Sequence, residues 1–166
     1  MHSVCEMIKR QTDANFVNLM ISIQTYDRNA LVKSAPAWRF VYHTLCSADR
    51  WYFNPNQYTP RENHEEGTQN PYHPISREWS DAELLGLLEA VRQKTMDYLD
   101  NLDDSMLNEC PPDCEFTRLE LILMQFRHMG VHIGMLNGQT VEHTGKFPLY
   151  VSPHSMDRLQ NGYWEE

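Results

Sequence analysis

The sequence predicts an all-α fold, a four-helix bundle that forms one domain over residues 1–166. A chain of 166 residues is long enough to bury one substantial core. Apolar residues recur at helical spacing in four segments. Three of these segments begin with a capping box, in which a hydroxyl residue is followed three positions later by a carboxylate: Ser3 with Glu6, Ser80 with Glu83, and Thr117 with Glu120.

The first half of the chain predicts two helices. We expect the first over residues 4–26, with apolar positions that include Val4, Ile8, Leu19 and Ile23. Ser34 and Pro36 open the second, which runs to residue 53, because proline is tolerated in a first helical turn. Its inward stripe consists of Trp38, Val41, Leu45, Ala48 and Tyr52. His43 lies on the other side, so periodicity by itself predicts that this histidine is exposed.

A long loop is predicted between the second and third helices, over residues 54–79. The segment has no helical or strand period, and four prolines prevent a long helix. Loops of this length in a compact domain are usually functional lids or disordered segments. The aromatic residues Tyr58 and Tyr72 favour packing over the bundle, and we expect His64 and His73 to be solvent histidines and not ligands.

The second half of the chain predicts two more helices and an aromatic tail. The third helix spans residues 81–102, with a stripe of Leu84, Leu88, Val91, Tyr98 and Leu102. The fourth covers 119–137, and Gly138 is expected to stop it. The tail at 138–166 is rich in aromatic residues, so we expect it to pack on the bundle or on a second subunit.

Composition narrows the classes of function. The formal net charge is −9 with a pI near 5.3, which argues against a nucleic-acid-binding surface. The chain has no apolar run near the ~18 residues of a membrane helix and no signal-peptide core at its start, so a cytoplasmic location is expected. Cys110 and Cys114 have three residues between them and no second such pair exists, so a zinc knuckle is not expected.

The fourth helical segment carries the first indication of chemistry. His128 and His132 lie four residues apart, and positions i and i+4 share one face of a helix, so both imidazoles can bind one metal ion. The apolar stripe of this segment is predicted nearly opposite the histidines, at Leu119, Ile122, Phe126, Gly130 and Ile133. Two core histidines that are hydrogen-bonded to carbonyl groups are the alternative interpretation.

Two motifs resemble those of a known family. The segment YHTLCSADRWYF in the second helix and RHMGVHIGMLNG in the fourth, in this order, resemble the DinB-like superfamily, whose relatives include bacillithiol transferases and mycothiol-dependent isomerases. The resemblance covers residues 34–139. It implies a four-helix bundle that holds a divalent metal ion, zinc or nickel, on His43, His128 and His132. It also implies a homodimer.

The resemblance implies thiol chemistry. A cation on three histidines keeps open positions, where a thiol or water loses its proton near neutral pH. The implied reaction is the transfer of a low-molecular-weight thiol to a small electrophile. Gln125 is a candidate for binding a water or a ligand nitrogen, and Arg39 and Arg50 for holding a substrate carboxylate, although unremarkable surface roles fit these three residues as well.

Two other functions stay open at this point. The motif HMGVH lacks the glutamate of HExxH, so a zincin protease is not expected, but another metal-dependent hydrolase is compatible with the histidines. A metal-binding stress-response protein without catalytic activity is compatible too, because a complete ligand set indicates metal binding and not turnover.

Overall fold

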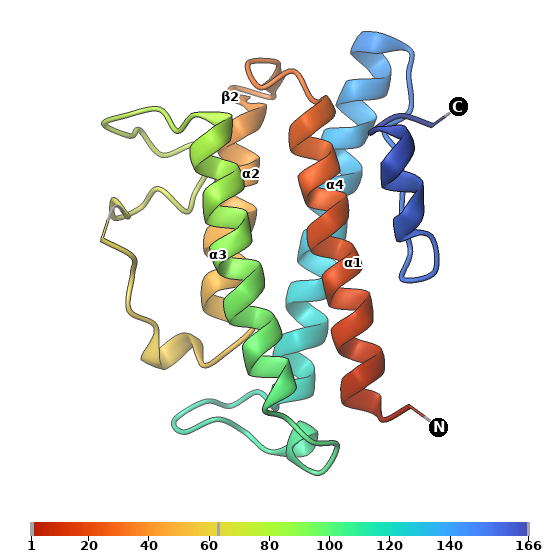
Figure 1. Ribbon diagram of the computed structural model, residues 1–166. Helices are drawn as coiled ribbons and strands as arrows, with labels where there is room; N and C mark the ends of the chain where they lie inside the picture. Colours follow the sequence, from red (N-terminus) through yellow and green to blue (C-terminus); the bar gives the residue numbers. More distant parts are fainter. Residues whose placement is uncertain (1, 63, 166) are drawn as a thin grey trace.

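Four α-helices of 15 to 27 residues form the framework of the protein (Figure 1). The computed structural model describes residues 2–62 and 64–165. The helices are α1 (Val4–Thr25), α2 (Ala37–Trp51), α3 (Asp81–Asp100) and α4 (Arg118–Thr144). Short elements connect or follow them: β1 (Leu31–Val32), β2 (Ala35–Pro36), and the 3₁₀ turns η1 (Pro55–Gln57), η2 (Met106–Asn108) and η3 (Met156–Asn161). The predicted all-α four-helix bundle is confirmed.

The helix starts confirm all three capping boxes. In α1, α3 and α4 the hydroxyl of the cap residue accepts the amide proton three residues on, and the carboxylate there accepts the amide proton of the cap. The start of α2 differs from the prediction, since residues 34–36 are not helical. Ala35 and Pro36 pair with β1 in a small hairpin, and Lys33 lies in its turn with a φ of 58°.

The prediction that Gly138 ends the fourth helix is wrong. α4 continues through Gly138 to Thr144, and its C-cap is Gly145, whose φ of 71° lies in the left-handed region. Glycine adopts this conformation without the Cβ clash of other residues. Gly138 stays helical because the residues on both sides of it continue to pack: Leu136 and Thr140 are both buried.

The core follows the predicted stripes with local shifts. All five residues of the predicted α2 stripe are buried, as are Leu19 and Ile23 of α1 and Leu84, Leu88 and Val91 of α3. Val4 is exposed. In α4 the observed stripe is displaced from the predicted one, since Gly130 is exposed and Leu119 and Phe126 are half-buried. The buried positions of α4 are Leu121, Ile122, Gln125, Met129, Ile133, Leu136 and Thr140.

The order of helix directions explains the long loop. α1 runs up in the view of Figure 1, α2 and α3 both run down, and α4 runs up again. Each helix packs mainly on two neighbours, with α1 beside α3 and α4 and with α2 beside α3 and α4. Because α2 and α3 are parallel, the chain must cross back over the length of α2, which has 15 residues and is therefore about 22 Å long.

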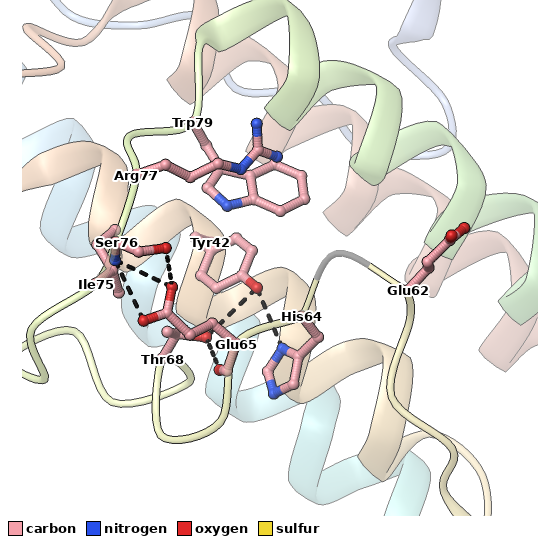
Figure 2. Close-up of a pocket in the computed structure, with 9 residues that line it drawn as sticks. All are labelled: Tyr42, Glu62, His64, Glu65, Thr68, Ile75, Ser76, Arg77 and Trp79. Atoms are coloured by element: carbon pink, nitrogen blue, oxygen red, sulfur yellow. Dashed lines mark hydrogen bonds between the residues drawn. The ribbon is translucent and has the colours of Figure 1, made fainter.

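The crossover segment packs on the outer side of α2, and Figure 2 shows part of it. The Tyr42 hydroxyl lies 3.1 Å from Nδ1 of His64. Asp49, which is 3% exposed, receives two hydrogen bonds from Arg61. The preference for loop packing over disorder is therefore confirmed. His73 is exposed as expected, whereas His64 is half-buried against α2 and is not a solvent histidine.

The aromatic tail packs on α1. Leu149 and Val151 are buried against Val17 and Ile21, and both hydrogen-bonding atoms of the Asn18 side chain pair with the backbone of Val151. Part of the tail therefore packs on the bundle, whereas Phe147 and Tyr150 are 63% and 62% exposed, and packing of the tail on a second subunit stays a prediction. On α4, Leu123 and Val131 are 53% and 62% exposed, and the homodimer stays a prediction. Among the residues that the structure describes, none of the helices combines the length and apolarity that a bilayer span requires.

Substitution of two glycines by alanine tests where α4 ends. A Cβ at Gly138 or at Gly145 meets no atom within 4 Å, so sterics do not distinguish the two sites. We expect Gly138→Ala to raise the free energy of unfolding by about 0.5–1 kcal/mol, because alanine favours a helix interior. We expect Gly145→Ala to lower it by about 1 kcal/mol, because of the left-handed φ. Urea denaturation of both variants measures these changes, and equal signs would contradict this helix end.

Candidate metal centre

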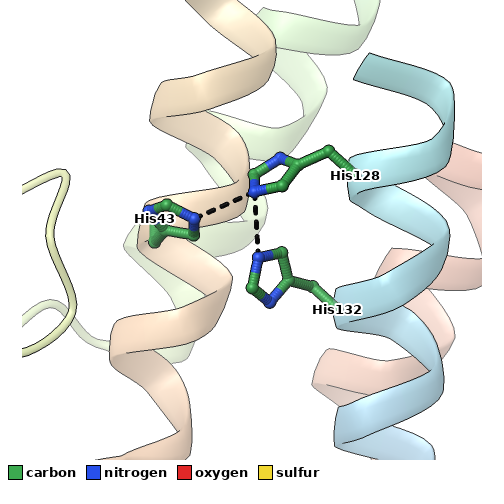
Figure 3. A group of neighbouring side chains, drawn as sticks. All are labelled: His43, His128 and His132. Carbon is green, nitrogen blue, oxygen red and sulfur yellow. Dashed lines mark hydrogen bonds between the residues drawn. The ribbon is translucent and has the colours of Figure 1, made fainter. Parts of the chain in front are cut away.

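Three histidines from two helices meet at the interface of α2 and α4 (Figure 3). His128 and His132 lie one turn apart on α4, and His43 faces them from α2. Nε2 of His128 is 3.0 Å from Nε2 of His43 and 3.0 Å from Nε2 of His132. The expectation from periodicity that His43 is exposed is wrong, since this side chain is half-buried and points at the pair.

The spacing of the Nε2 atoms matches a shared cation. Two nitrogens bound to one zinc ion at about 2.0–2.1 Å are roughly 2.9 Å apart at a right angle and about 3.4 Å apart at a tetrahedral angle. Hydrogen bonds between the rings explain the short Nε2 distances less well than a shared cation does. An imidazole nitrogen has either one proton or one lone pair in the ring plane, and Nε2 of His128 has two nitrogen neighbours at 3.0 Å. The cluster could therefore hold a metal ion.

The protonation state of the cluster also suits a metal. Burial lowers the pKa of His128 to about 4, and the neighbouring His43 contributes in the same direction. Burial lowers the pKa of His132 to about 3, with contributions from His128 and His43. Burial lowers the pKa of His43 too, against an opposing hydrogen bond to the Gln69 backbone. The lowered pKa values favour the neutral form of all three rings, which can donate a lone pair without first losing a proton.

Two of the three rings have a partner for the nitrogen that faces away from the cluster. Nδ1 of His43 contacts the backbone carbonyl of Gln69 in the crossover loop, and a carbonyl accepts only if Nδ1 carries the proton. This tautomer leaves Nε2 free as a metal ligand. Nδ1 of His132 is buried and has no hydrogen-bond partner within the described part of the chain. Phe40 lies beside that ring, at 6.1 Å between centroids.

Gln125 is the partner of the outward-facing nitrogen of His128, which is Nδ1. Its side chain is 2% exposed, its amide nitrogen lies 3.4 Å from Nδ1 of His128, and its amide oxygen lies 3.0 Å from the Ser47 hydroxyl. Amide oxygen and nitrogen are assigned from the network. If Nε2 of His128 binds a metal, Nδ1 carries a proton, and the reversed amide then accepts from Nδ1 and donates to Ser47. Gln125 thus lies within reach of a ligand nitrogen, and its surface alternative is wrong.

The two candidate arginines lie in different surroundings. Arg39 is 6% exposed, and its guanidinium donates to the carbonyl groups of Asn70 and His73 at 3.0 Å and 2.7 Å. Arg39 therefore anchors the crossover loop to α2. Arg50 is exposed, and its Nε donates to the Pro55 carbonyl at 3.2 Å. A role of either arginine in binding a substrate carboxylate stays a prediction.

Sequence spacing did not indicate the contact between Cys46 and His64. Cys46 Sγ lies 3.9 Å from Nδ1 of His64, which is 18 residues away in the loop. Burial raises the pKa of the Cys46 thiol to about 12. Because the thiolate is the nucleophilic form, burial disfavours a role of Cys46 as a nucleophile at neutral pH. No local motif connects the two residues, so only the fold reveals their proximity.

Comparisons of the chain with protein-family models, with curated proteins and with solved structures found no match. The three-histidine cluster in a helical bundle is accordingly the feature from which a function has to be inferred.

Exchange of Gln125 tests its role as the partner of His128. We expect Gln125→Met, which is similar in size and cannot accept from Nδ1, to weaken zinc binding about 10–100-fold. Gln125→Glu keeps an acceptor there and should bind zinc at least as tightly as the wild type. Competition with a chromophoric chelator measures both affinities. Equal losses in the two variants would indicate a packing role only.

The histidine cluster also predicts how stability depends on pH without metal. The pKa of histidine falls from its ordinary value of 6.5 to about 4 in His128 and to about 3 in His132. At a pH between 6.5 and these lowered pKa values, the unfolded chain therefore binds more protons than the folded chain. The free energy of unfolding therefore declines as pH drops from about 6.5 toward 4. Chelator-treated protein should show this decline in urea denaturation at pH 7, 6 and 5, and His132→Gln should show a shallower one.

Proposed function

We propose that the protein is a DinB-like metalloprotein that transfers a thiol to an electrophile. His43, His128 and His132 would bind one divalent cation, zinc or nickel. The observation that supports the metal site is the convergence of three Nε2 atoms, with His128 Nε2 at 3.0 Å from each of the others. A family assignment rests on the resemblance of the two histidine segments and on the observed bundle.

The reaction we propose is a substitution at an electrophilic carbon. A divalent cation held by His43, His128 and His132 would lower the pKa of a thiol at the site, so that the thiol would lose its proton to solvent near neutral pH. The sulfur then forms a bond to the electrophilic carbon while the bond from that carbon to its leaving group breaks with its electron pair. The three histidines would hold the cation, and the Gln69 carbonyl and the Gln125 side chain would orient two of them.

The number of ligands favours catalysis over a purely structural metal. Structural zinc sites are usually closed by four protein ligands, whereas catalytic sites use three and leave a position for water or substrate. Within the described residues, the cluster comprises three histidines and no cysteine or carboxylate. This composition supports a transferase over a metal-binding bundle protein without activity.

The same composition favours a thiol over water as the nucleophile. No carboxylate of the described residues belongs to the cluster, so a hydrolase would lack an adjacent general base. A free thiol has a pKa of about 8.5, whereas that of bulk water is about 15.7, so the thiol needs much less help to ionise. We therefore place metal-dependent hydrolysis second.

A single histidine substitution tests the metal site. We expect His128→Ala to weaken metal binding by more than about 100-fold, because loss of an orienting partner alone costs about 10–100-fold. Its helical content should persist, since the helices are held together by their apolar stripes. His143→Ala is the matched control, because His143 is an exposed histidine of the same helix. Elemental analysis and far-UV circular dichroism of the three proteins provide the measurement.

Turnover is tested with the same proteins and a chromogenic aryl chloride. The zinc-loaded or nickel-loaded wild type and His143→Ala should accelerate conjugation in proportion to added low-molecular-weight thiol, and His128→Ala should not. Metal binding with no thiol-dependent rate would exclude the transferase and leave the non-catalytic bundle. Equal metal in wild type and His128→Ala would exclude the site itself.

A further inference from the structure

We propose that a cavity between α2 and the crossover loop binds the carboxylate end of a peptide-sized thiol. In this arrangement Arg50 holds the carboxylate and the sulfur of the same molecule reaches the histidine cluster. The inference rests on the proposed function, since it identifies the class of thiol that the metal site would use. It is carried by the position of the cavity, by the unpaired charge of Arg50 and by the distance along α2.

The cavity borders a crossover-loop residue that supports the histidine cluster, although none of the three histidines lines the cavity itself. Its volume is about 380 Å³, and it is walled by Cys46 and Arg50 of α2 and by Tyr58, His64 and Gln69 of the loop. Gln69 is shared by the two sites, because its carbonyl contacts Nδ1 of His43. A ligand in this cavity therefore lies next to a residue that directly supports the cluster.

Arg50 is the only cation of fixed charge in the described lining of the cavity, and it has no anionic partner there. Its Nε donates to the Pro55 carbonyl, and its guanidinium carbon lies 5.5 Å and 5.9 Å from the ring centroids of Trp51 and Tyr58. Over residues 2–62 and 64–165, no carboxylate lies within 4.0 Å of the Arg50 guanidinium. In a chain with net charge −9, an arginine held in place but left unpaired is suited to an incoming anion.

The nearby cations of the same region are already engaged. Arg61 and Lys94 both pair with Asp49, at 2.9 Å in each case. Arg39 has no carboxylate partner among the described residues either, but it is 6% exposed, its terminal nitrogen donates to two loop carbonyls and it does not line this cavity. Of the two arginines that the sequence indicates for carboxylate binding, Arg50 is the one whose guanidinium borders this cavity.

The length of the ligand follows from the helix. His43 and Arg50 are seven residues apart on α2, which places them about 10 Å apart along nearly the same helix face. An extended peptide covers about 3.3–3.6 Å per residue, so about three residues join a sulfur at the cluster to a carboxylate at Arg50. The lining also includes Glu66, whose charge disfavours ligands with several negative groups. A tripeptide-sized thiol with one carboxylate at the far end fits these constraints.

An experiment that varies both the ligand and the protein tests the contact between Arg50 and the carboxylate. It uses the zinc-loaded protein. The probes are the tripeptide Cys-Gly-Gly with a free terminal carboxylate and its terminal amide, and isothermal titration calorimetry measures their binding. We expect amidation to weaken binding to the wild type about tenfold, in line with a charge-assisted hydrogen bond. Arg50→Gln should bind both probes equally weakly. Arg127→Gln, at an exposed arginine of α4, should discriminate like the wild type.

Several outcomes would overturn the inference. They are an amidation effect of the same size in Arg50→Gln as in the wild type, an absence of discrimination in the wild type, or no binding of Cys-Gly-Gly at millimolar concentration. A third probe, Ser-Gly-Gly, distinguishes failure of this inference from failure of the proposed function. If replacement of sulfur by oxygen weakens binding only when zinc is present, the thiol contacts the metal whatever Arg50 does.

Discussion

The packing of α2 against α4 is the constraint on which the candidate site depends. Leu45 and Ala48 of α2 and Met129 of α4 are fully buried, so neither helix can rotate or slide without losing close-packed contacts. The histidines project from the edge of this same interface. A rotation of α2 by one residue, about 100°, would turn His43 away from the pair on α4. The energy that positions the imidazoles therefore comes from apolar residues that take no part in the chemistry.

The parallel arrangement of α2 and α3 has a second consequence for the site. It requires a crossover segment that runs along α2, and this segment supplies the Gln69 carbonyl to His43. The crossover is attached at several points of α2, through Arg61 on Asp49 and through Arg39 on two loop carbonyls. The long loop thus connects two helices, supports one histidine and closes one side of a cavity. A shorter connection would require α3 to run in the opposite direction.

The polar groups around the cluster show how a buried site is kept compatible with an apolar core. Gln125 and Ser47 pair across the α2 and α4 interface, so each of these two polar groups has a partner. Burial also keeps the histidines neutral, which favours a cation over protons in the cluster. Burial likewise raises the pKa of Cys46 and keeps its thiol protonated. Burial therefore favours the metal-binding form of the imidazoles, which is neutral, and disfavours the nucleophilic form of the thiol, which is charged.

The sequence by itself determined the features that depend on neighbours along the chain. The three capping boxes, the stripe of α2 and the shared face of His128 and His132 are local consequences of the 3.6-residue period and of hydrogen bonds within one turn. Gly138 resembles a stop because glycine gives the same local signal inside a helix and at its end, and only the packing of Leu136 and Thr140 shows that α4 continues.

The tertiary structure decided where separate segments meet. The single stripe of α2 predicts an exposed His43, but this helix is covered on one side by the bundle and on another by the loop, and His43 lies at the border of the two. The resemblance of the motifs grouped His43 with His128 and His132, and the packing brings their Nε2 atoms together. The contact with Gln69, the contact of Cys46 with His64 and the cavity beside Arg50 have no local signal, because they join residues whose proximity is set by helix packing and by the path of the crossover.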